Sequence, residues 1–319
     1  MGRLKAVWHI YSITEQMNAT DNARRAKRLR LSPMLAMSPT IVIVGAVYVG
    51  CLLWTLFVSF TDSRSIPDLT WSGFGQWSRL YADYRWRNAF HNMFLFGALY
   101  IGGCLLLGYV LAVLIDQRVK GENFFRTVFL CPHALSFIVT GQLWKWYLDP
   151  EFGLQRTVRE LGWSTFTFDW IADRHLAIYT IVIAGIWQSV GVVMVLMLAG
   201  LRSIDEDIWK VTRVDGIPAW RVYLSVVPPM VVPSILTSVA LLGTGAVKNY
   251  DLVIAMTDGG PGIATDVPSK FVMEYLFERS NIGLAAAGAT TMLITTIAVA
   301  APLLLWQAWQ RRRIARGAA

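Results

Sequence analysis

Six long runs of apolar residues, separated by shorter polar segments, dominate this 319-residue chain. A helix needs about 20 apolar residues to cross a hydrocarbon core roughly 30 Å thick. Each run is expected to be helical, because an unpaired backbone group is costly in lipid. The pattern therefore predicts an all-α integral membrane protein with a six-helix domain over residues 38–308. The predicted spans are 38–60, 92–115, 127–147, 177–200, 229–247 and 285–308.

Composition supports the same class of protein. Apolar residues make up 55% of the chain and charged residues 16%, against about 45–50% and about 25% in soluble domains. Fourteen tryptophans and a mean hydropathy of +0.46 agree with contact to lipid. Cys51, Cys104 and Cys131 show no C-x-x-C spacing. They are interpreted as small apolar packing residues, and no metal site is predicted.

The distribution of Lys and Arg predicts an orientation. If the N-terminus is cytoplasmic, 18 of the 29 Lys and Arg residues lie in inner segments, 10 in outer loops and one, Lys145, in a span. Cytoplasmic segments of membrane proteins carry the excess of these residues. Both basic tails, 1–37 and 309–319, are therefore predicted to be cytoplasmic. The net charge of +8 is then a topology signal with a secondary use in contacting anionic lipid, and no nucleic-acid-binding motif accompanies it.

The segment 201–228, between the fourth and fifth spans, is then a cytoplasmic loop. Ser203 and Glu206 have the spacing of a capping box, and an apolar stripe follows at helical spacing. The stripe consists of Ile204, Ile208 and Val211, with Trp209 and Thr212 beside it. The loop is therefore predicted to begin with an amphipathic helix.

A turn and a second short helix are expected to follow. Gly216, after Asp215, can adopt a positive φ and close the first helix, and Pro218 suits the first turn of the next one. Helices of this length are marginal alone in water, and each exposed apolar side chain forgoes about 1.5–3 kcal/mol of burial. The hairpin 203–227 is therefore predicted to pack on the inner ends of its own spans or on a partner protein.

The passage resembles the cytoplasmic coupling loop of ATP-binding cassette (ABC) importer permeases, whose pattern is E-A-A, two residues, D-G-A, an aromatic residue and L-P-x-x-x-P. Lys210, Val211 and Thr212 stand in place of Glu-Ala-Ala, Ile217 in place of the Ala and Pro228 in place of the Leu. The resemblance implies that this loop inserts into a cleft on an ATPase subunit. The coupling residues predicted from it are Ile208, Lys210, Val211, Asp215, Gly216, Trp220, Tyr223, Pro229 and Pro233.

A second match follows the fifth span, on the predicted outer side. Residues 249–251 (Asn-Tyr-Asp) followed by 256–262 (Met-Thr-Asp-Gly-Gly-Pro-Gly) resemble the Thr-x-Gly-Gly-Pro segment of carbohydrate permeases. A tight external turn is the alternative interpretation. The residues of this predicted turn are Thr257, Gly259, Gly260 and Pro261. With the stretch 140–150 (TGQLWKWYLDP), they indicate the MalF-like carbohydrate permeases of binding-protein-dependent ABC importers, in the glucose/mannose-type branch.

The resemblance implies a complete import machine of which this chain is one part. It implies the type I ABC importer permease fold in the cytoplasmic (inner) membrane of a bacterium, and a cargo that is a sugar, such as glucose or mannose. A second permease forming a heterodimer, an ABC ATPase dimer and an extracytoplasmic sugar-binding protein are the implied partners. The chain is expected to be a non-catalytic transport subunit without a cofactor, with ATP and Mg bound by the partner ATPase.

Two absences agree with an external source of energy. The chain has no G-x-x-x-x-G-K-[ST] phosphate loop. The charges in or beside the spans, Lys145, Lys248 and Asp251, lie near predicted outer ends, whereas ion-coupled carriers commonly use ionisable groups near the midplane. The alternatives are an ABC permease for another cargo, such as a disaccharide or glycerol phosphate, a self-sufficient secondary carrier or channel, and a membrane scaffold without a transport path.

Candidate residues of the sugar path follow from chemistry, because sugars are held by flat aromatic faces and hydrogen-bonding side chains. These candidates are Trp144, Lys145, Trp187, Gln188, Asn249, Tyr250 and Asp251. Each of three candidates also has a purely structural interpretation. Trp144 could belong to an interfacial aromatic belt, Lys145 could reach the outer interface, and Gln188 could bond a neighbouring helix.

Overall fold

The computed structural model describes residues 37–66, 68–117 and 119–317, and the predicted N-terminal tail lies outside them except for its last residue. Its contacts divide the chain into two units, 1–57 and 58–319. In the first unit, a helix beginning at Met37 runs to Val58, at the boundary with the second unit, and its residues are almost all exposed. This helix corresponds to the predicted first span.

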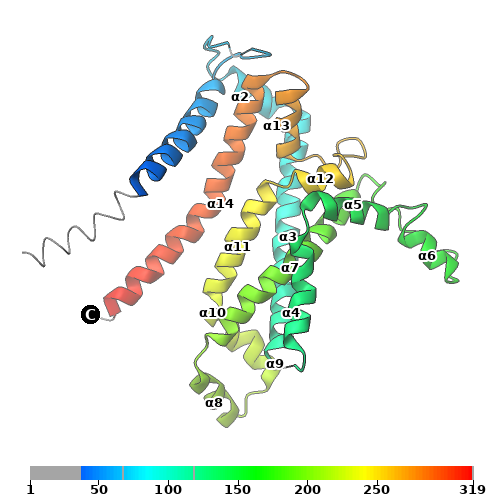
Figure 1. Ribbon diagram of the computed structural model, residues 1–319, viewed down its shortest axis with the longest axis vertical. Helices are drawn as coiled ribbons and strands as arrows, with labels where there is room; N and C mark the ends of the chain where they lie inside the picture. The colour runs from blue at the N-terminus through cyan, green and yellow to red at the C-terminus, as the bar shows by residue number, and fades with distance from the viewer. Residues whose placement is uncertain (1–36, 67, 118, 318–319) are drawn as a thin grey trace, which may run out of the picture. The chain divides into compact units, whose positions relative to one another are not determined.

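The second unit is helical throughout, and within the described residues the only β-type pairing is an isolated bridge between Thr61 and Trp71. Its elements are shown in Figure 1. They are α2 (Gly75–Ala82), α3 (Tyr84–Asp116), α4 (Glu122–Leu130), η1 (Cys131–Ala134), α5 (Phe137–Tyr147), α6 (Leu154–Glu160), α7 (Ala177–Arg202), α8 (Glu206–Val214), α9 (Ala219–Arg221), η2 (Val222–Val226), α10 (Val227–Met230), α11 (Val232–Val247), α12 (Asp251–Met256), α13 (Pro268–Phe277) and α14 (Ile282–Gly317).

Three predicted spans of this unit are continuous helices, α3, α7 and α14. The bounds of α7 match the prediction to within two residues, but α3 begins eight residues before the predicted Asn92. Asp83 caps its N-terminus by accepting a hydrogen bond from the Arg85 backbone N–H at 2.7 Å. The added turns are polar and amphipathic, so a hydropathy pattern does not include them. Similarly, α14 extends beyond both predicted ends of the last span.

The predicted span 127–147 is not a single helix in the structure, because the chain bends by 98° between α4–η1 and α5. Pro132 lies in the short 3₁₀ segment, and Ser136 starts the new helix by accepting a hydrogen bond from the Val139 N–H at 3.3 Å. The break leaves the Leu135 carbonyl without a helical partner, and the Gln188 side-chain amide donates to it at 2.8 Å. A side chain of α7 therefore satisfies the backbone group that the bend exposes.

The predicted span 229–247 also begins in a broken helix, with a bend of 70° between α9–α10 and α11. Pro228, Pro229 and Pro233 lack the backbone N–H groups that an uninterrupted helix would need here. The chain responds with a π-helical stretch, η2, and the Ser225 hydroxyl donates to the Arg221 carbonyl at 2.6 Å. The proline cluster therefore marks a bend.

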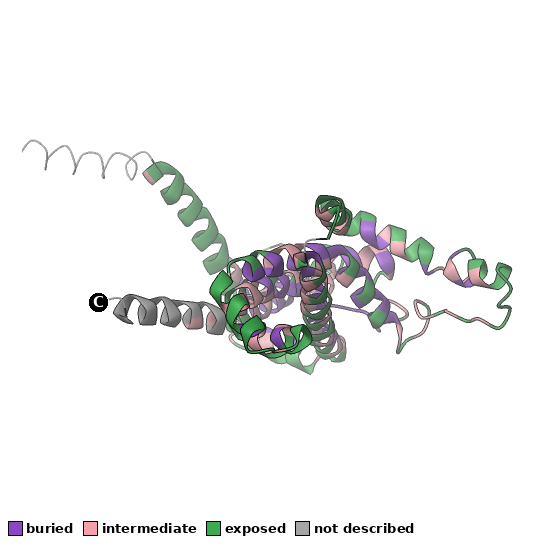
Figure 2. Ribbon diagram, turned by 90° about the horizontal axis from the view of Figure 1, so that it is seen from below, coloured by how far each residue is buried: buried purple, intermediate pink, exposed green. Residues whose placement is uncertain are grey.

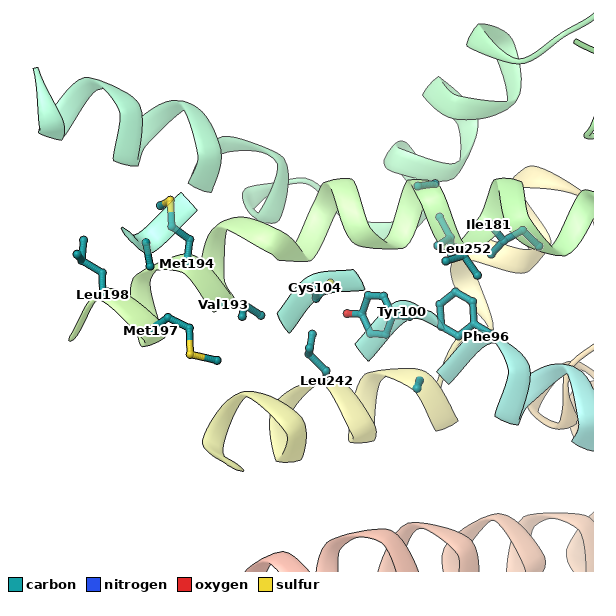
Figure 3. Close-up of a cluster of buried hydrophobic side chains, with 14 of the residues drawn as sticks. Phe96, Tyr100, Cys104, Ile181, Val193, Met194, Met197, Leu198, Leu242 and Leu252 are labelled. Atoms are coloured by element: carbon teal, nitrogen blue, oxygen red, sulfur yellow. The ribbon is translucent and has the colours of Figure 1, made fainter. Parts of the chain in front are cut away.

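The main core lies where α3 packs along α7, with α11 against both. Figure 3 shows part of this cluster, including Tyr100, Cys104 and Leu242. Buried residues line the inside of the helix bundle and exposed residues its outside (Figure 2). A second, smaller core joins α2, α13 and the first turns of α3 and α14, and we call this region the cap. Its core residues are Leu80, Trp86, Phe271, Leu284 and Ala287.

Gly191 on α7 is required for the close approach of the broken span. A Cβ atom at this position would lie 2.0 Å from the carbonyl oxygen of Phe129, which is backbone and has no rotamer to change. We expect Gly191→Ala to destabilise the fold by at least about 1–3 kcal/mol, the cost of overpacking. The yield of monodisperse protein after detergent extraction measures this. Gly102→Ala is the control, because nothing lies within 4 Å of a Cβ there; equal yields would contradict the prediction.

Candidate functional site

A cavity of about 380 Å³ lies beside the bend between η1 and α5. It is enclosed by α3, α7, α11, the bent segment and the start of α12. Its lining residues are Tyr100, His133, Phe137, Ser189, Val192, Leu241, Leu242, Thr244, Gly245, Lys248, Asn249, Asp251 and Leu252. This volume lies within the range of small-molecule sites. Polar groups on an otherwise apolar wall make it a candidate ligand site.

One wall of this cavity carries a buried pair of hydroxyl groups. Tyr100 on α3 donates a hydrogen bond to the Ser189 hydroxyl on α7 at 2.7 Å. The Tyr100 ring is stacked on Phe96, with centroids 5.1 Å apart and an interplanar angle of 16°. The stack holds the hydroxyl at a fixed depth in the bundle, where Tyr100 is only 4% exposed.

Another part of the lining is the break between α11 and α12, and it carries most of the charge. Lys248 follows the last residue of α11, and Asp251 is the first residue of α12. Between them, Asn249 is 7% exposed, and its side-chain NH₂ group has no hydrogen-bond partner within the described part of the chain. A buried donor without a partner is costly.

The predicted sugar-path residues divide into two groups. Asn249 and Asp251 line the cavity, whereas Tyr250 beside them does not. The other candidates lie outside its lining. Trp144 and Trp187 pack edge to face, with centroids 5.9 Å apart, Gln188 bonds the Leu135 carbonyl, and Lys145 is exposed in the last turn of α5. Gln188 therefore makes the kind of contact that its structural interpretation predicted, a hydrogen bond to another segment of the bundle.

Sequence reasoning missed Tyr100, His133 and Ser189. Each is a polar side chain inside or beside an apolar run, which is the signal that could have pointed to them. His133 adjoins Pro132 at the bend, so a proline inside a predicted span was the second available signal. No set of three or more His, Cys, Asp or Glu residues that could hold a metal ion occurs among the residues the structure describes.

A second site is the hairpin between α7 and α11, which projects from one end of the bundle with α8 and α9 (Figure 1). The predicted capping box is wrong: Asp205 caps α8, accepting a hydrogen bond from the Asp207 N–H at 2.9 Å. Ser203 instead ends α7 and donates to the Gly200 carbonyl at 2.7 Å. Both residues can cap a helix, but α7 continues to Arg202, so Ser203 is the C-cap of α7 and lies two positions before the N-cap of α8.

The predicted turn of the hairpin is present. Asp215 is the C-cap of α8, and Gly216 follows with φ +67°. The Ile217 N–H donates to the Thr212 carbonyl at 3.1 Å and so closes the helix end. Pro218 then stands as the N-cap of α9, one position before the predicted first turn.

The hairpin is anchored to the bundle on its inner side. The rings of Trp209 and Tyr223 pack with centroids 5.6 Å apart, and the Tyr109 hydroxyl of α3 donates to the Tyr223 carbonyl at 2.6 Å. Thr212 is buried, and its hydroxyl donates to the Trp209 carbonyl at 3.1 Å, whereas Ile208 is half-buried. Lys210 is exposed and pairs with Asp207 at 2.7 Å. Pro229 in α10 and Pro233 in the first turn of α11 lie on the two sides of the bend.

Four large apolar side chains of the hairpin are exposed. We call these four residues, Val211, Val214, Trp220 and Leu224, the hairpin surface; they are 56%, 86%, 62% and 68% exposed. The predicted stripe is therefore wrong in placing Val211 with Ile204 and Ile208. An isolated hairpin would lose stability by exposing this much apolar area, so the hairpin surface is a candidate protein interface.

Between the hairpin and the adjacent helix ends lies a hollow of about 1100 Å³ with a largely charged lining. Arg202 at the end of α7 pairs with Glu122 at 2.9 Å and with Asp116 at 3.7 Å. These pairs join the ends of α3, α4 and α7. The ion pairs therefore hold these helix ends together, and the hollow separates part of the hairpin from them.

The turn after α12 is held together by its own hydroxyl groups. The Thr257 and Thr265 hydroxyls lie 2.7 Å apart, and Thr265 also donates to the Gly260 carbonyl at 2.8 Å. Gly259 has φ +79°, and a Cβ atom there would lie 2.7 Å from Nζ of Lys270. The predicted Thr-x-Gly-Gly-Pro turn, which includes Pro261, is therefore compact.

Glu274 in the cap receives two guanidinium groups. Arg85 donates to both of its carboxylate oxygens, and Arg279 donates to Oε1 at 2.9 Å. The hydrogen bonds from Arg85, followed by those from Arg279, lower the pKa of Glu274 to about 2 against the opposing effect of burial. The carboxylate is therefore charged throughout the physiological range.

Lowering the pH is expected to remove the stability that Glu274 contributes. Because its folded-state pKa is depressed, the contribution is fully present above the ordinary pKa near 4.5 and is lost as the pH falls towards 2. The stability difference between the parent and Glu274→Gln should shrink over this window in thermal unfolding. Glu160→Gln, from an exposed pair with Arg156, is the control. A difference that does not change between pH 5 and 2 would contradict the assignment.

These features are those of a helical membrane protein. The described residues hold four continuous candidate spans, or six if each bent pair counts as one. Cargo sites in membrane transporters commonly lie where spans are broken. A family model described as a binding-protein-dependent transport system inner membrane component matches residues 120–316, and the chain belongs to this family.

Known proteins resemble the chain over most of its length. A probable ABC transporter permease of Pyrococcus horikoshii is 34% identical over 275 residues, 86% of this chain and 94% of that protein. The xylose/arabinose import permease XacH of Haloferax volcanii is 31% identical over 273 residues, 84% and 85% of the two chains. The fold matches a crystal structure of a bacterial ABC transporter involved in the import of the acidic polysaccharide alginate. That match has a TM-score of 0.75 at 17% identity and covers 90% of this chain and 97% of the other. The chain therefore has the type I ABC importer permease fold.

Proposed function

We propose that this chain is a permease subunit of an ATP-driven importer for a carbohydrate. A separate ATPase that binds the hairpin surface would supply the energy. The observation that carries the proposal is the pairing of two sites in one fold: the exposed hairpin surface and, at the helix breaks, a mainly apolar cavity that carries hydroxyl, amide and charged groups. Membership of the binding-protein-dependent family supports it.

The cavity would form this subunit's half of the translocation path. Its lining combines hydroxyl groups from Tyr100 and Ser189 with amide and charged groups from Asn249, Lys248 and Asp251. This mixture of donors and acceptors suits a ligand with many hydroxyl groups. The xylose/arabinose and alginate systems among the similar proteins support carbohydrate as the cargo class. The glucose/mannose-type cargo stays a prediction within that class.

The hairpin surface would dock in a cleft of the ATPase. Val214 and Trp220 would be removed from water there, and the rigid anchoring by Trp209 and Tyr223 would transmit movement of the ATPase to the end of α11. ATP and Mg would be bound by the two ATPase subunits. A related second permease and an extracytoplasmic sugar-binding protein would complete the assembly in the bacterial inner membrane, with both termini of this chain cytoplasmic.

The test is reconstitution of the co-purified assembly in liposomes, followed by uptake of labelled sugars. We expect uptake that requires ATP, the binding protein and this chain together. Uptake by this chain alone, driven by an ion or sugar gradient, would replace the proposal with a self-sufficient carrier. An assembly that hydrolyses ATP in response to a non-carbohydrate cargo would retain the ABC mechanism and overturn the cargo class.

A further inference from the structure

A row of polar side chains on the first turns of α3 holds the turn that follows α12. Asn88 donates to the Ile263 carbonyl at 2.6 Å, and Asn92 donates to the carbonyls of Ala264 and Asp266, each at 2.9 Å. The positions 85, 88 and 92 recur at helical spacing, so they share one face of α3. Three consecutive side chains on this face thus form hydrogen bonds with the backbone and side chains of one loop.

Arg85 is the ionic centre of this contact. Its Nε donates to Asp266, whose side chain is 1% exposed, and its two terminal nitrogens bind both oxygens of Glu274 on α13. One guanidinium therefore joins α3, the turn and α13. Removing it would leave Asp266 as a buried charge without a counter-ion, which is among the costliest single changes in a protein interior.

We call Arg85, Asn88 and Asn92 the clamp. The turn that they hold follows α12, whose first residues line the cavity. Asp251 and Leu252, which line the cavity, are the first residues of α12, and the turn begins at the other end of this six-residue helix. The body of α12 packs on α5, where Gly141 allows the approach: a Cβ there would lie 2.5 Å from that of Ala255. The helix is thus held by α5 along its side and by α3 through the turn at its end.

We propose that Arg85, with Asn88 and Asn92, is a positioning residue for the cargo cavity: it fixes α12 and thereby sets the placement of Asn249 and Asp251. This role rests on the proposed function, since it assigns the clamp to the same cavity. The clamp lies far from the hairpin in sequence, and none of its three residues lines the cavity. Its effect on transport is therefore expected to pass through the position of α12 relative to α3, which carries Tyr100.

The experiment uses cysteine labelling, which depends on neither cargo nor ATP. Val253 on α12 is fully buried, so Val253→Cys reacts with a maleimide only when α12 moves. Cys104 is also fully buried, in the main core, and reports general loss of structure, while Cys51 and Cys131 are replaced by serine. The full transporter in lipid nanodiscs is labelled with and without the substitution Arg85→Gln.

We expect Arg85→Gln to raise the labelling rate of Val253→Cys by about tenfold, within the usual range for coupled networks, and to leave Cys104 protected. Arg85→Lys should fall between the two, since lysine keeps the charge but lacks the fork that binds two carboxylates. Arg79→Gln, which removes an exposed pair with Asp62 at 3.4 Å in the same region, should have no effect. An unchanged rate at Val253→Cys, or a parallel rise at Cys104, would overturn the proposal and leave the proposed importer function untouched.

In sugar uptake, the same Arg85→Gln variant should raise the apparent KM for cargo by about tenfold with a smaller effect on the maximal rate. A misplaced cavity wall weakens cargo contacts, whereas a simple loss of folded protein lowers the maximal rate and leaves KM unchanged. A fall in maximal rate alone would contradict the positioning role.

Discussion

Uptake of cargo is expected to fall by at least about 100-fold when Gly245 is replaced by phenylalanine, because the ring would fill a cavity whose volume is near the lower limit for small-molecule sites. Gly245 lies on α11 and lines the cavity of about 380 Å³. A Cβ atom there would meet only the Tyr100 hydroxyl, at 4.0 Å, so the side chain has room to enter. Basal ATP hydrolysis by the assembly should persist, because the hairpin is unchanged.

Gly102→Phe is the matched control for this plug. Gly102 lies on α3, and nothing lies within 4 Å of a Cβ built there. Like Gly245→Phe, this substitution replaces a helical glycine with phenylalanine, but it does so outside the cavity. Labelled-sugar uptake and ATPase activity are measured on both variants. Full uptake with Gly245→Phe would exclude the cavity from the path.

The second large effect is expected at the hairpin turn. Gly216→Val should abolish the coupling of ATP hydrolysis to uptake, because a β-branched residue at φ +67° costs at least about 1–2 kcal/mol and would refold the turn. Asparagine tolerates this backbone region far better, so Gly216→Asn should retain most of the coupling. The ratio of sugar molecules imported to ATP hydrolysed is the measurement.

Gly121 allows strain to be separated from coupling. It also has a positive φ, +86°, with nothing within 4 Å of a Cβ, but it caps α4 and lies outside the hairpin. Gly121→Val therefore imposes a similar backbone strain on a neighbouring loop. If Gly121→Val and Gly216→Val reduce coupling equally, the hairpin has no special role as a lever.

Much of the fold could be predicted from the sequence because hydropathy is a local property. The long helix α7 and the Asp215–Gly216 turn both depend on residues within a few positions of one another. The bends could not be predicted in the same way. Pro132 permits a bend, but the geometry also requires Gln188, 53 residues away from Leu135, to satisfy the exposed carbonyl.

Within the candidate site, the sequence pointed only to residues that lie close to one another along the chain. Asn249 and Asp251 adjoin the end of an apolar run, so their polarity stands out. The other wall pairs Tyr100 with Ser189, 89 positions apart, and the clamp pairs Arg85 with Glu274, 189 positions apart. Such pairings arise from helix packing, which the hydropathy pattern of one chain does not encode. The choice of Asp205 over Ser203 as the cap of α8 likewise depended on where α7 ends.

The central claim is that a separate ATPase holds the hairpin surface, and cysteine chemistry at Val214 tests it most directly. Val214 is 86% exposed, so Val214→Cys reacts freely with a maleimide in this chain alone. In the assembled transporter the account predicts protection of this cysteine and its cross-linking to the ATPase subunit. Phe277→Cys, 70% exposed in the cap, should stay reactive in both. Unhindered labelling of Val214→Cys with the ATPase bound would contradict the account.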